Sequence, residues 1–360
     1  MIENNRIKSV LATKPKGKIK ELGNGVIIPA LVNAHVHLEL SALETDLAFD
    51  QGFTAWVRQL LNKRDNLGEN RLRQAANRAA KGLKALGTGI IGEISTLGIT
   101  RDLVQKNGLS GIWFQECLGG AIPKDILPKA QDLIKNNLFF SMAGHAPHTC
   151  SPDLLGRLKT QTAAQGLVFS IHLAESCEES EFLDKGKGLW ADFLLSRKID
   201  IRNWPVGNTT PVGYLHKLGI LDSATLGVHL LHLNAKDIDI LADTGTQICL
   251  SPRSNENLHQ RLPDIEKMLK KGLDPALGTD SLASCASLSL FDEMAFVRTH
   301  YPNIKPETIF NMATINGAKA LGLDHKFGCL APGKASCFVY LDMDVPNKNQ
   351  LLERLTWNEI

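Results

Sequence analysis

The sequence lacks a charge excess, a long apolar run and any closely paired cysteines. Its 360 residues carry 40 Lys and Arg against 38 Asp and Glu, so the formal net charge is only +2. No block of like charge indicates a nucleic acid or a membrane surface as partner. No window reaches the roughly 18 apolar residues of a spanning helix, and the polar N-terminus has no signal-peptide core. We therefore expect a small-molecule partner.

The seven cysteines are scattered along the chain, and no two of them form a C-x-x-C pair. An odd number without that spacing argues against a disulfide framework and against a zinc site built from thiolates. With 43% hydrophobic and 22% charged residues, the composition is that of a folded, soluble chain. These features predict a cytoplasmic protein and leave open whether it forms a homo-oligomer.

Short β-rich runs alternate with longer stretches of helical spacing along most of the chain. The expected strands are 31–40, 89–95, 111–118, 138–145, 167–174, 225–232, 246–251 and 274–279. The expected helices between them include 71–86, 153–165, 178–197, 235–243 and 288–299. Parallel neighbours need a crossover of about a dozen residues, so eight such units predict an α/β fold, a (β/α)8 TIM barrel. A doubly wound sheet is the alternative, but no G-x-G-x-x-G follows the first strand.

Both ends of the chain depart from this alternation. We expect residues 1–28 and 327–360 to form one small β-sandwich-like module, and residues 29–326 to form the barrel. Within the barrel, a stripe with helical spacing is expected to pack on the outside. It consists of Phe53, Trp56, Val57, Leu60 and Leu61.

Histidines and one aspartate stand at the ends of four expected strands. They are His35, His37, His172, His229 and Asp280. Side chains alternate along a strand, so His35 and His37 face the same side. The carboxyl ends of barrel strands meet at the face where barrel enzymes hold their chemistry. Three imidazoles and a carboxylate with one open position suit zinc or ferrous iron acting as a Lewis acid.

These segments resemble the amidohydrolase superfamily, in its deaminase and chlorohydrolase branch, over nearly the whole chain. The matching stretches are residues 26–39 (VIIPALVNAHVHLE), 172–175 (HLAE), His229 with Gly245, 251–255 (SPRSN) and 278–281 (GTDS). The resemblance implies that His35, His37, His172 and Asp280 bind one divalent metal, zinc or ferrous iron. It implies a proton shuttle at Glu175, and at His229 a residue that polarises or orients water, with Asp280 also accepting a proton. Two-metal branches carry a carboxylated lysine on the fourth strand, and residues 138–145 contain no lysine.

Four further residues are candidates for substrate binding. His145 resembles a family histidine that commonly contacts substrate. Glu93 and Glu116 end the second and third expected strands, where they could bind ribose hydroxyls or polar ring edges, or serve as structural carboxylates. Arg253 could clamp an anionic substrate group or pair with a carboxylate.

A narrower resemblance lies in residues 38–64, through the segment LELS, the pair Gly52-Phe53, and Trp56, Leu60 and Arg64. These residues are similar to those of aminodeoxyfutalosine deaminases, which hydrolyse the 6-amino group of an adenosine-like nucleoside in menaquinone biosynthesis. The resemblance implies a metal-dependent aminohydrolase, with water and an aminated purine nucleoside as reactants. Deaminases of adenosylhomocysteine, methylthioadenosine or guanine share the metal site and stay open. So do chloride hydrolysis, the opening of a cyclic amide, and a barrel that only binds a ligand.

Overall fold

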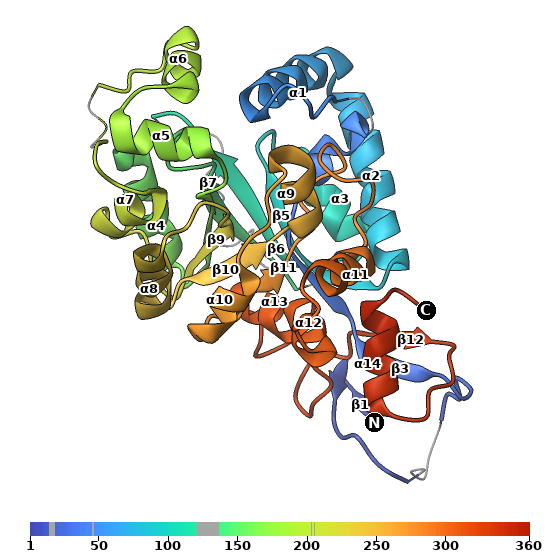
Figure 1. Cartoon of the computed structure of the whole chain (residues 1–360). Coiled ribbons are helices and arrows are strands. Elements are labelled where there is room, and N and C mark those ends of the chain that lie inside the picture. Colours follow the sequence, from blue (N-terminus) through green and yellow to red (C-terminus); the bar gives the residue numbers. More distant parts are fainter. Residues whose placement is uncertain (14–18, 45–46, 121–136, 203, 205) are drawn as a thin grey trace.

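The computed structural model describes residues 1–13, 19–44, 47–120, 137–202, 204 and 206–360. Residues 14–18, part of the expected N-terminal module, lie outside the described residues. The centre is an eight-stranded parallel sheet in the order β11-β10-β9-β8-β7-β6-β5-β4 (Figure 1). Its strands are β4 (Leu31–Val36), β5 (Thr88–Ser95), β6 (Ser110–Cys117), β7 (Leu138–Gly144), β8 (Phe169–Leu173), β9 (Thr225–His229), β10 (Gln247–Leu250) and β11 (Ala276–Leu277).

The first and last strands approach each other and nearly close the sheet into a barrel. Asn33 Nδ2 donates to Thr279 Oγ1 at 2.7 Å, and the Thr279 N–H donates to Asn33 Oδ1 at 3.2 Å. Gly278 permits this approach, because a Cβ there would lie only 2.8 Å from His35 Cβ. The sheet order and this closure confirm the expected TIM-like barrel.

Helices surround the barrel and extend beyond its strand ends. In α2 (Glu69–Ala85), Leu72, Ala76, Ala80 and Leu83 are buried on one face, as the helical period requires. The remaining helices are α1 (Phe53–Leu67), α3 (Arg101–Lys106), α4 (Pro152–Ala164), α5 (Cys177–Lys185), α6 (Leu189–Ser196), α7 (Pro211–Lys217), α8 (Ala235–Thr244), α9 (Pro252–His259), α10 (Ile265–Lys270), α11 (Leu290–His300), α12 (Pro306–Met312), α13 (Ile315–Ala320) and α14 (Lys348–Thr356). Among the described residues, no helix combines the length and apolar character needed to cross a membrane.

Segments from the two ends of the chain pair as short antiparallel sheets. β1 (Ile2–Glu3) pairs with β2 (Arg6–Ile7), and β3 (Val26–Pro29) pairs with β12 (Phe338–Leu341). Both termini lie on this side of the molecule, next to α14 (Figure 1). The expected β structure at the chain ends is confirmed, whereas the exact module boundaries stay a prediction. The helix α14 was not expected from the sequence.

Two expected elements are corrected by the structure. The strand expected over 31–40 ends at Val36, and a 3-10 helix, η1 (Leu38–Leu43), follows it. The helix expected over 178–197 is divided into α5 and α6. Gly186 and Gly188, with φ of 66° and 108°, separate the two helices, because these backbone conformations suit glycine and end the helical path.

The apolar stripe of α1 does not pack on the outside of the barrel, and that expectation was wrong. The helix packs on η1 and α2 beyond the strand ends, on the same side of the molecule as α6 (Figure 1). Its apolar side chains line a pocket together with residues of the strand ends. An amphipathic period shows that a helix has an apolar face, but not which surface covers that face.

Candidate active site at the mouth of the barrel

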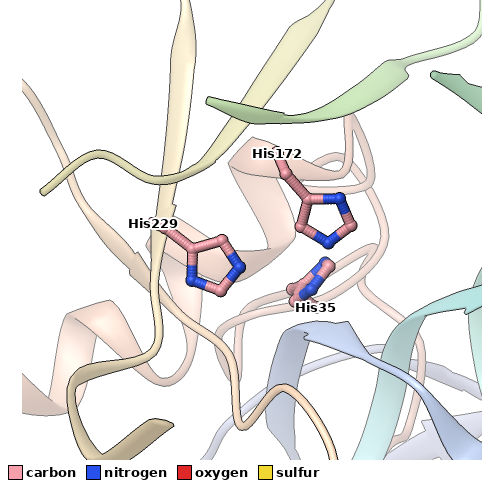
Figure 2. Close-up of side chains that lie close together, drawn as sticks. All are labelled: His35, His172 and His229. Carbon is pink, nitrogen blue, oxygen red and sulfur yellow. The ribbon is translucent and has the colours of Figure 1, made fainter. Parts of the chain in front are cut away.

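Three histidines and an aspartate converge at the carboxyl end of the barrel. His37 Nε2 lies 3.2 Å from His35 Nε2 and 3.3 Å from His172 Nε2. Asp280 Oδ1 lies 3.7 Å from Nε2 of both His35 and His37. Figure 2 shows the imidazoles of His35 and His172 directed toward each other. The side chains expected to bind a metal are thus brought together around one point.

The spacing and protonation of these groups fit a divalent metal ion. Two nitrogen ligands of a tetrahedral zinc ion, each about 2.0–2.1 Å from the metal, lie about 3.3–3.4 Å apart. Burial lowers the pKa of His35 and His37, and that of His172 to about 3, so the imidazoles are neutral at pH 7. His172 Nδ1–H donates to the His145 carbonyl at 2.6 Å, which leaves the Nε2 lone pair for a metal.

Asp280 is held by two hydroxyl groups. Ser254 Oγ and Ser284 Oγ both donate to Asp280 Oδ2, at 2.6 and 2.7 Å. Oδ1 is thereby directed toward the histidines. Burial raises the pKa of this carboxyl, but the adjacent His35 and His37 outweigh burial and hold the pKa well below its usual range. Asp280 is therefore ionised, as both a metal ligand and a proton acceptor must be.

His229 lies beside the cluster with a fixed ring orientation (Figure 2). Its Nδ1–H donates to Asn255 Oδ1 at 2.9 Å, so Nε2 carries the lone pair. Nε2 lies 3.7 Å from Glu175 Oε1. His229 also forms a three-histidine group with His35 and His172, whose candidate ligand atoms lie within 4.8 Å of one another. The residue can therefore act on a molecule bound next to the metal site.

Glu175 follows β8 and lines the pocket. Its backbone N–H donates to Glu179 Oε2 at 2.8 Å, and its Oε1 lies 3.3 Å from His259 Nε2. Burial raises the pKa of Glu175, but the adjacent His229 and the hydrogen bond with His259 lower it further, and the net pKa lies far below the usual range. The carboxylate is therefore ready to accept a proton.

Three residues at the mouth adopt left-handed backbone conformations that are uncommon for residues other than glycine. The φ angles are 53° at Ala174, 77° at His229 and 59° at Asp280. Such conformations cost about 1–3 kcal/mol each and concentrate at functional sites. They end the strands abruptly, so that the side chains of Glu175, His229 and Asp280 can all face the pocket.

Two of the four substrate-binding candidates line the pocket, namely His145 and Glu116. Burial lowers the pKa of His145 to about 4, and His145 Nδ1 hydrogen-bonds Thr149 Oγ1 at 2.8 Å. Glu116 Oε2 accepts from Thr96 Oγ1 at 2.6 Å, whereas its buried Oε1 has no hydrogen-bond partner in the described structure. An unsatisfied buried acceptor at a pocket wall is available to a donor on a ligand.

The other two candidates, Glu93 and Arg253, are absent from the described residues that line the pocket. Glu93 is fully buried and accepts from the Leu38 N–H at 3.1 Å, so it supports the turn after β4. Arg253 donates to Glu293 Oε1 at 2.9 Å and lies 3.3 Å from Asp292. The structure thus gives both residues structural partners, and Arg253 takes the carboxylate-pairing alternative.

Beyond the histidines, the pocket wall is mainly apolar and comes from helices α1 and α6. The apolar side chains from these two helices are Phe53, Trp56, Val57, Leu60, Leu61, Trp190, Phe193 and Leu194. Two arginines also line the pocket. Arg64 contacts the neighbouring Asp65 at 3.1 Å, whereas no side-chain partner of Arg197 is found among the described residues. The site can therefore hold a molecule that extends from the metal cluster along an apolar surface.

Sequence reasoning missed several residues that hold the site together. Ser254, Asn255 and His259 lie on α9, and each contacts a different residue of the cluster. The segment 251–255 had been singled out, but only Arg253 was given a role. The signal available was the helical period, because Asn255 and His259 are four residues apart and lie on one helix face.

Comparison with known proteins decides the family. The family model of the amidohydrolase family matches residues 26–357. The chain belongs to the amidohydrolase family. The chain is 30% identical over 319 residues to an aminodeoxyfutalosine deaminase of Deinococcus radiodurans, covering 84% of this chain and 75% of that protein. It is 29% identical over 348 residues to a 5-methylthioadenosine/S-adenosylhomocysteine deaminase of Moorella thermoacetica, covering 91% and 76%.

Solved structures agree on the fold. A Helicobacter pylori aminofutalosine deaminase in complex with methylthio-coformycin superposes with a TM-score of 0.81 at 24% identity, covering 92% of this chain and 83% of that one. An adenosine deaminase from Xanthomonas campestris with bound zinc gives 0.76 at 20% identity, covering 93% and 76%. The histidine cluster of this amidohydrolase is thus consistent with a metal site, in a fold whose solved examples include one with zinc.

Proposed function

We propose that this amidohydrolase is a metal-dependent deaminase that hydrolyses the 6-amino group of an adenosine-like nucleoside. The observation that carries the proposal is the convergence of His35, His37, His172 and Asp280 in one pocket with Glu175. A divalent ion held by these ligands, zinc or ferrous iron, would act as a Lewis acid that lowers the pKa of water toward neutrality. The named curated relatives are nucleoside deaminases, which supports the same reaction class.

The site residues divide the proton transfers between them. Asp280 accepts a proton from the attacking water, since its Oδ1 faces the histidines and Oδ2 is already bonded. His229 Nε2 orients the water toward the ring carbon that bears the amino group. Glu175 carries a proton to the adjacent ring nitrogen and then to the amine, which leaves as ammonia. Carbon–nitrogen cleavage is thereby balanced by the formation of the carbonyl product.

Aminodeoxyfutalosine is the substrate that we propose. A bulky 5′ extension on the ribose suits the apolar wall formed by α1 and α6. Glu116 Oε1 and His145 are available for polar edges of the nucleoside. Arg64 and Arg197 would favour a 5′ substituent that ends in an anionic group. Methylthioadenosine or adenosylhomocysteine is the alternative substrate, supported by the similarity to the Moorella enzyme.

Ammonia release from adenine, adenosine, methylthioadenosine and aminodeoxyfutalosine, followed in one assay, tests both parts of this proposal. We expect the highest kcat/KM for aminodeoxyfutalosine and a low kcat as well as a high KM for adenine. Binding energy from the non-reacting part of a substrate helps to align the reacting carbon. If adenine or guanine is the best substrate, the nucleoside assignment fails. If none of these compounds releases ammonia, the deaminase assignment fails as well.

A matched pair of variants tests the anionic end of the substrate. Arg64→Gln and Arg197→Gln should raise KM for a nucleoside whose 5′ substituent ends in a carboxylate. The same variants should leave methylthioadenosine, which has a neutral 5′ substituent, unchanged. An equal effect on both substrates would contradict charge recognition by these arginines.

A further inference from the structure

The helix α9 contacts three different residues of the site from one side. Ser254 Oγ donates to Asp280 at 2.6 Å, Asn255 Oδ1 accepts from His229 at 2.9 Å, and His259 Nε2 lies 3.3 Å from Glu175 Oε1. The end of the helix is also fixed, because Arg261 Nε donates to the Leu231 carbonyl at 3.0 Å. A rigid element that touches every proposed proton-transfer group can set their mutual positions.

We propose that His259 is a positioning residue for Glu175, an inference that rests on the deaminase function proposed above. An ionised carboxylate can only accept hydrogen bonds, so the contact requires a proton on His259 Nε2. The bond occupies Oε1 of Glu175. No described residue bonds Oε2, which leaves that oxygen for the substrate. His259 therefore fixes which oxygen of Glu175 exchanges the proton.

The backbone and the side chain of Glu175 have separate supports. Glu179 accepts the N–H groups of Ala174 and Glu175, at 3.2 and 2.8 Å, and so holds the strained turn. These bonds fix the position of the Glu175 Cα but not the rotation of its carboxylate. Rotation is restricted by His259, whose side chain is only 5% exposed. Loss of His259 should therefore disturb the carboxylate and leave the turn intact.

The imidazole of His259 is itself held by an aromatic contact. Its ring centroid lies 4.6 Å from that of Phe53, the first residue of α1, with the two planes tilted by 55°. Phe53 lines the pocket. The His259 ring is thus fixed between the pocket wall and Glu175, which gives its two functions, aromatic packing and N–H donation, to separable parts of one side chain.

Two substitutions separate packing from hydrogen bonding. His259→Phe keeps an aromatic ring against Phe53 but removes the donor. His259→Gln removes the ring, but its Nε2 can still donate to Glu175. If His259 positions Glu175, kcat of His259→Phe should fall about 10- to 100-fold, the range for a hydrogen bond to a charged group. KM and metal content should stay near wild type, and His259→Gln should recover most of the lost kcat.

The proposal would be overturned if His259→Phe kept the wild-type kcat, or if it were more active than His259→Gln, since packing alone would then explain His259. A crystal structure of His259→Phe gives a readout that does not depend on turnover. We expect a rotated Glu175 carboxylate above an unchanged Ala174 turn. An unmoved carboxylate would contradict the positioning role even if the protein proved to act on a different substrate class. Wild-type protein without any deaminase activity would overturn the proposed function separately.

Discussion

The two hydroxyls on Asp280 give a prediction about metal affinity. Ser254 and Ser284 donate to the same oxygen at 2.6 and 2.7 Å, the short distances of hydrogen bonds to an ionised acceptor. Partners that orient a metal ligand usually change metal affinity by about 10- to 100-fold, or about 1.4–2.7 kcal/mol. We expect Ser254→Ala and Ser284→Ala each to weaken metal binding by about 10-fold.

The double variant is expected to lose more than the product of the single effects. One remaining hydroxyl still anchors Oδ2, whereas loss of both leaves Asp280 free to rotate and leaves a buried charge without a donor. Contacting residues of this kind commonly couple by about 0.5–3 kcal/mol. The two single variants should therefore retain most of the ligand geometry that the double variant loses.

Competition with a chromophoric zinc chelator measures these affinities directly. Ser141→Ala is the matched control, because Ser141 is equally buried but donates to the Val168 carbonyl on the neighbouring strand segment. The control should lose some stability and no metal affinity. If the double variant binds zinc as tightly as the control, Asp280 is not an oriented ligand and the metal site has been assigned wrongly.

Other predictions concern the ligands, the proton shuttle and pH. His35→Ala combined with His37→Ala should abolish stoichiometric metal binding, and metal that persists on elemental analysis would exclude these ligands. Glu175→Gln should lower turnover by about 10²- to 10⁴-fold with unchanged metal content, and near-normal turnover would leave Glu175 with a structural role. The pKa of His145 is lowered from 6.5 to about 4 in the folded protein, so the unfolded chain binds more protons between these values and stability rises with pH across this window. Urea unfolding of the metal-loaded protein should show a weaker pH dependence for His145→Gln, and an equally steep dependence would show that His145 is not buried in neutral form.

The barrel could be predicted from the sequence because its pattern is repetitive and local. Each strand is a short apolar run, and each is followed by a helix, so the order of elements determines a parallel sheet. The histidines at strand ends were informative for the same reason. Their position relative to each strand places them at one face, even though they are as far apart in sequence as His35 and His172.

The parts that could not be predicted depend on contacts between distant segments. The stripe on α1 is equally apolar whether it covers the barrel or lines a pocket, and only the tertiary structure places Phe53 against His259. Likewise, Arg253 has the charge of an anion-binding residue, but Glu293 occupies its guanidinium. The role of such a residue is decided by its partner, which the local sequence does not reveal.

The measurement that tests the central claim most directly is hydrolysis in ¹⁸O-labelled water, followed by mass spectrometry of the nucleoside. With metal-loaded wild-type protein and an adenosine-like substrate, the account predicts one ammonia released and one labelled oxygen at the ring carbon that carried the amino group. Glu175→Gln should form the same product at a much lower rate. If the substrate retained its amino group, or if the product carried no label, hydrolytic deamination at this site would be contradicted.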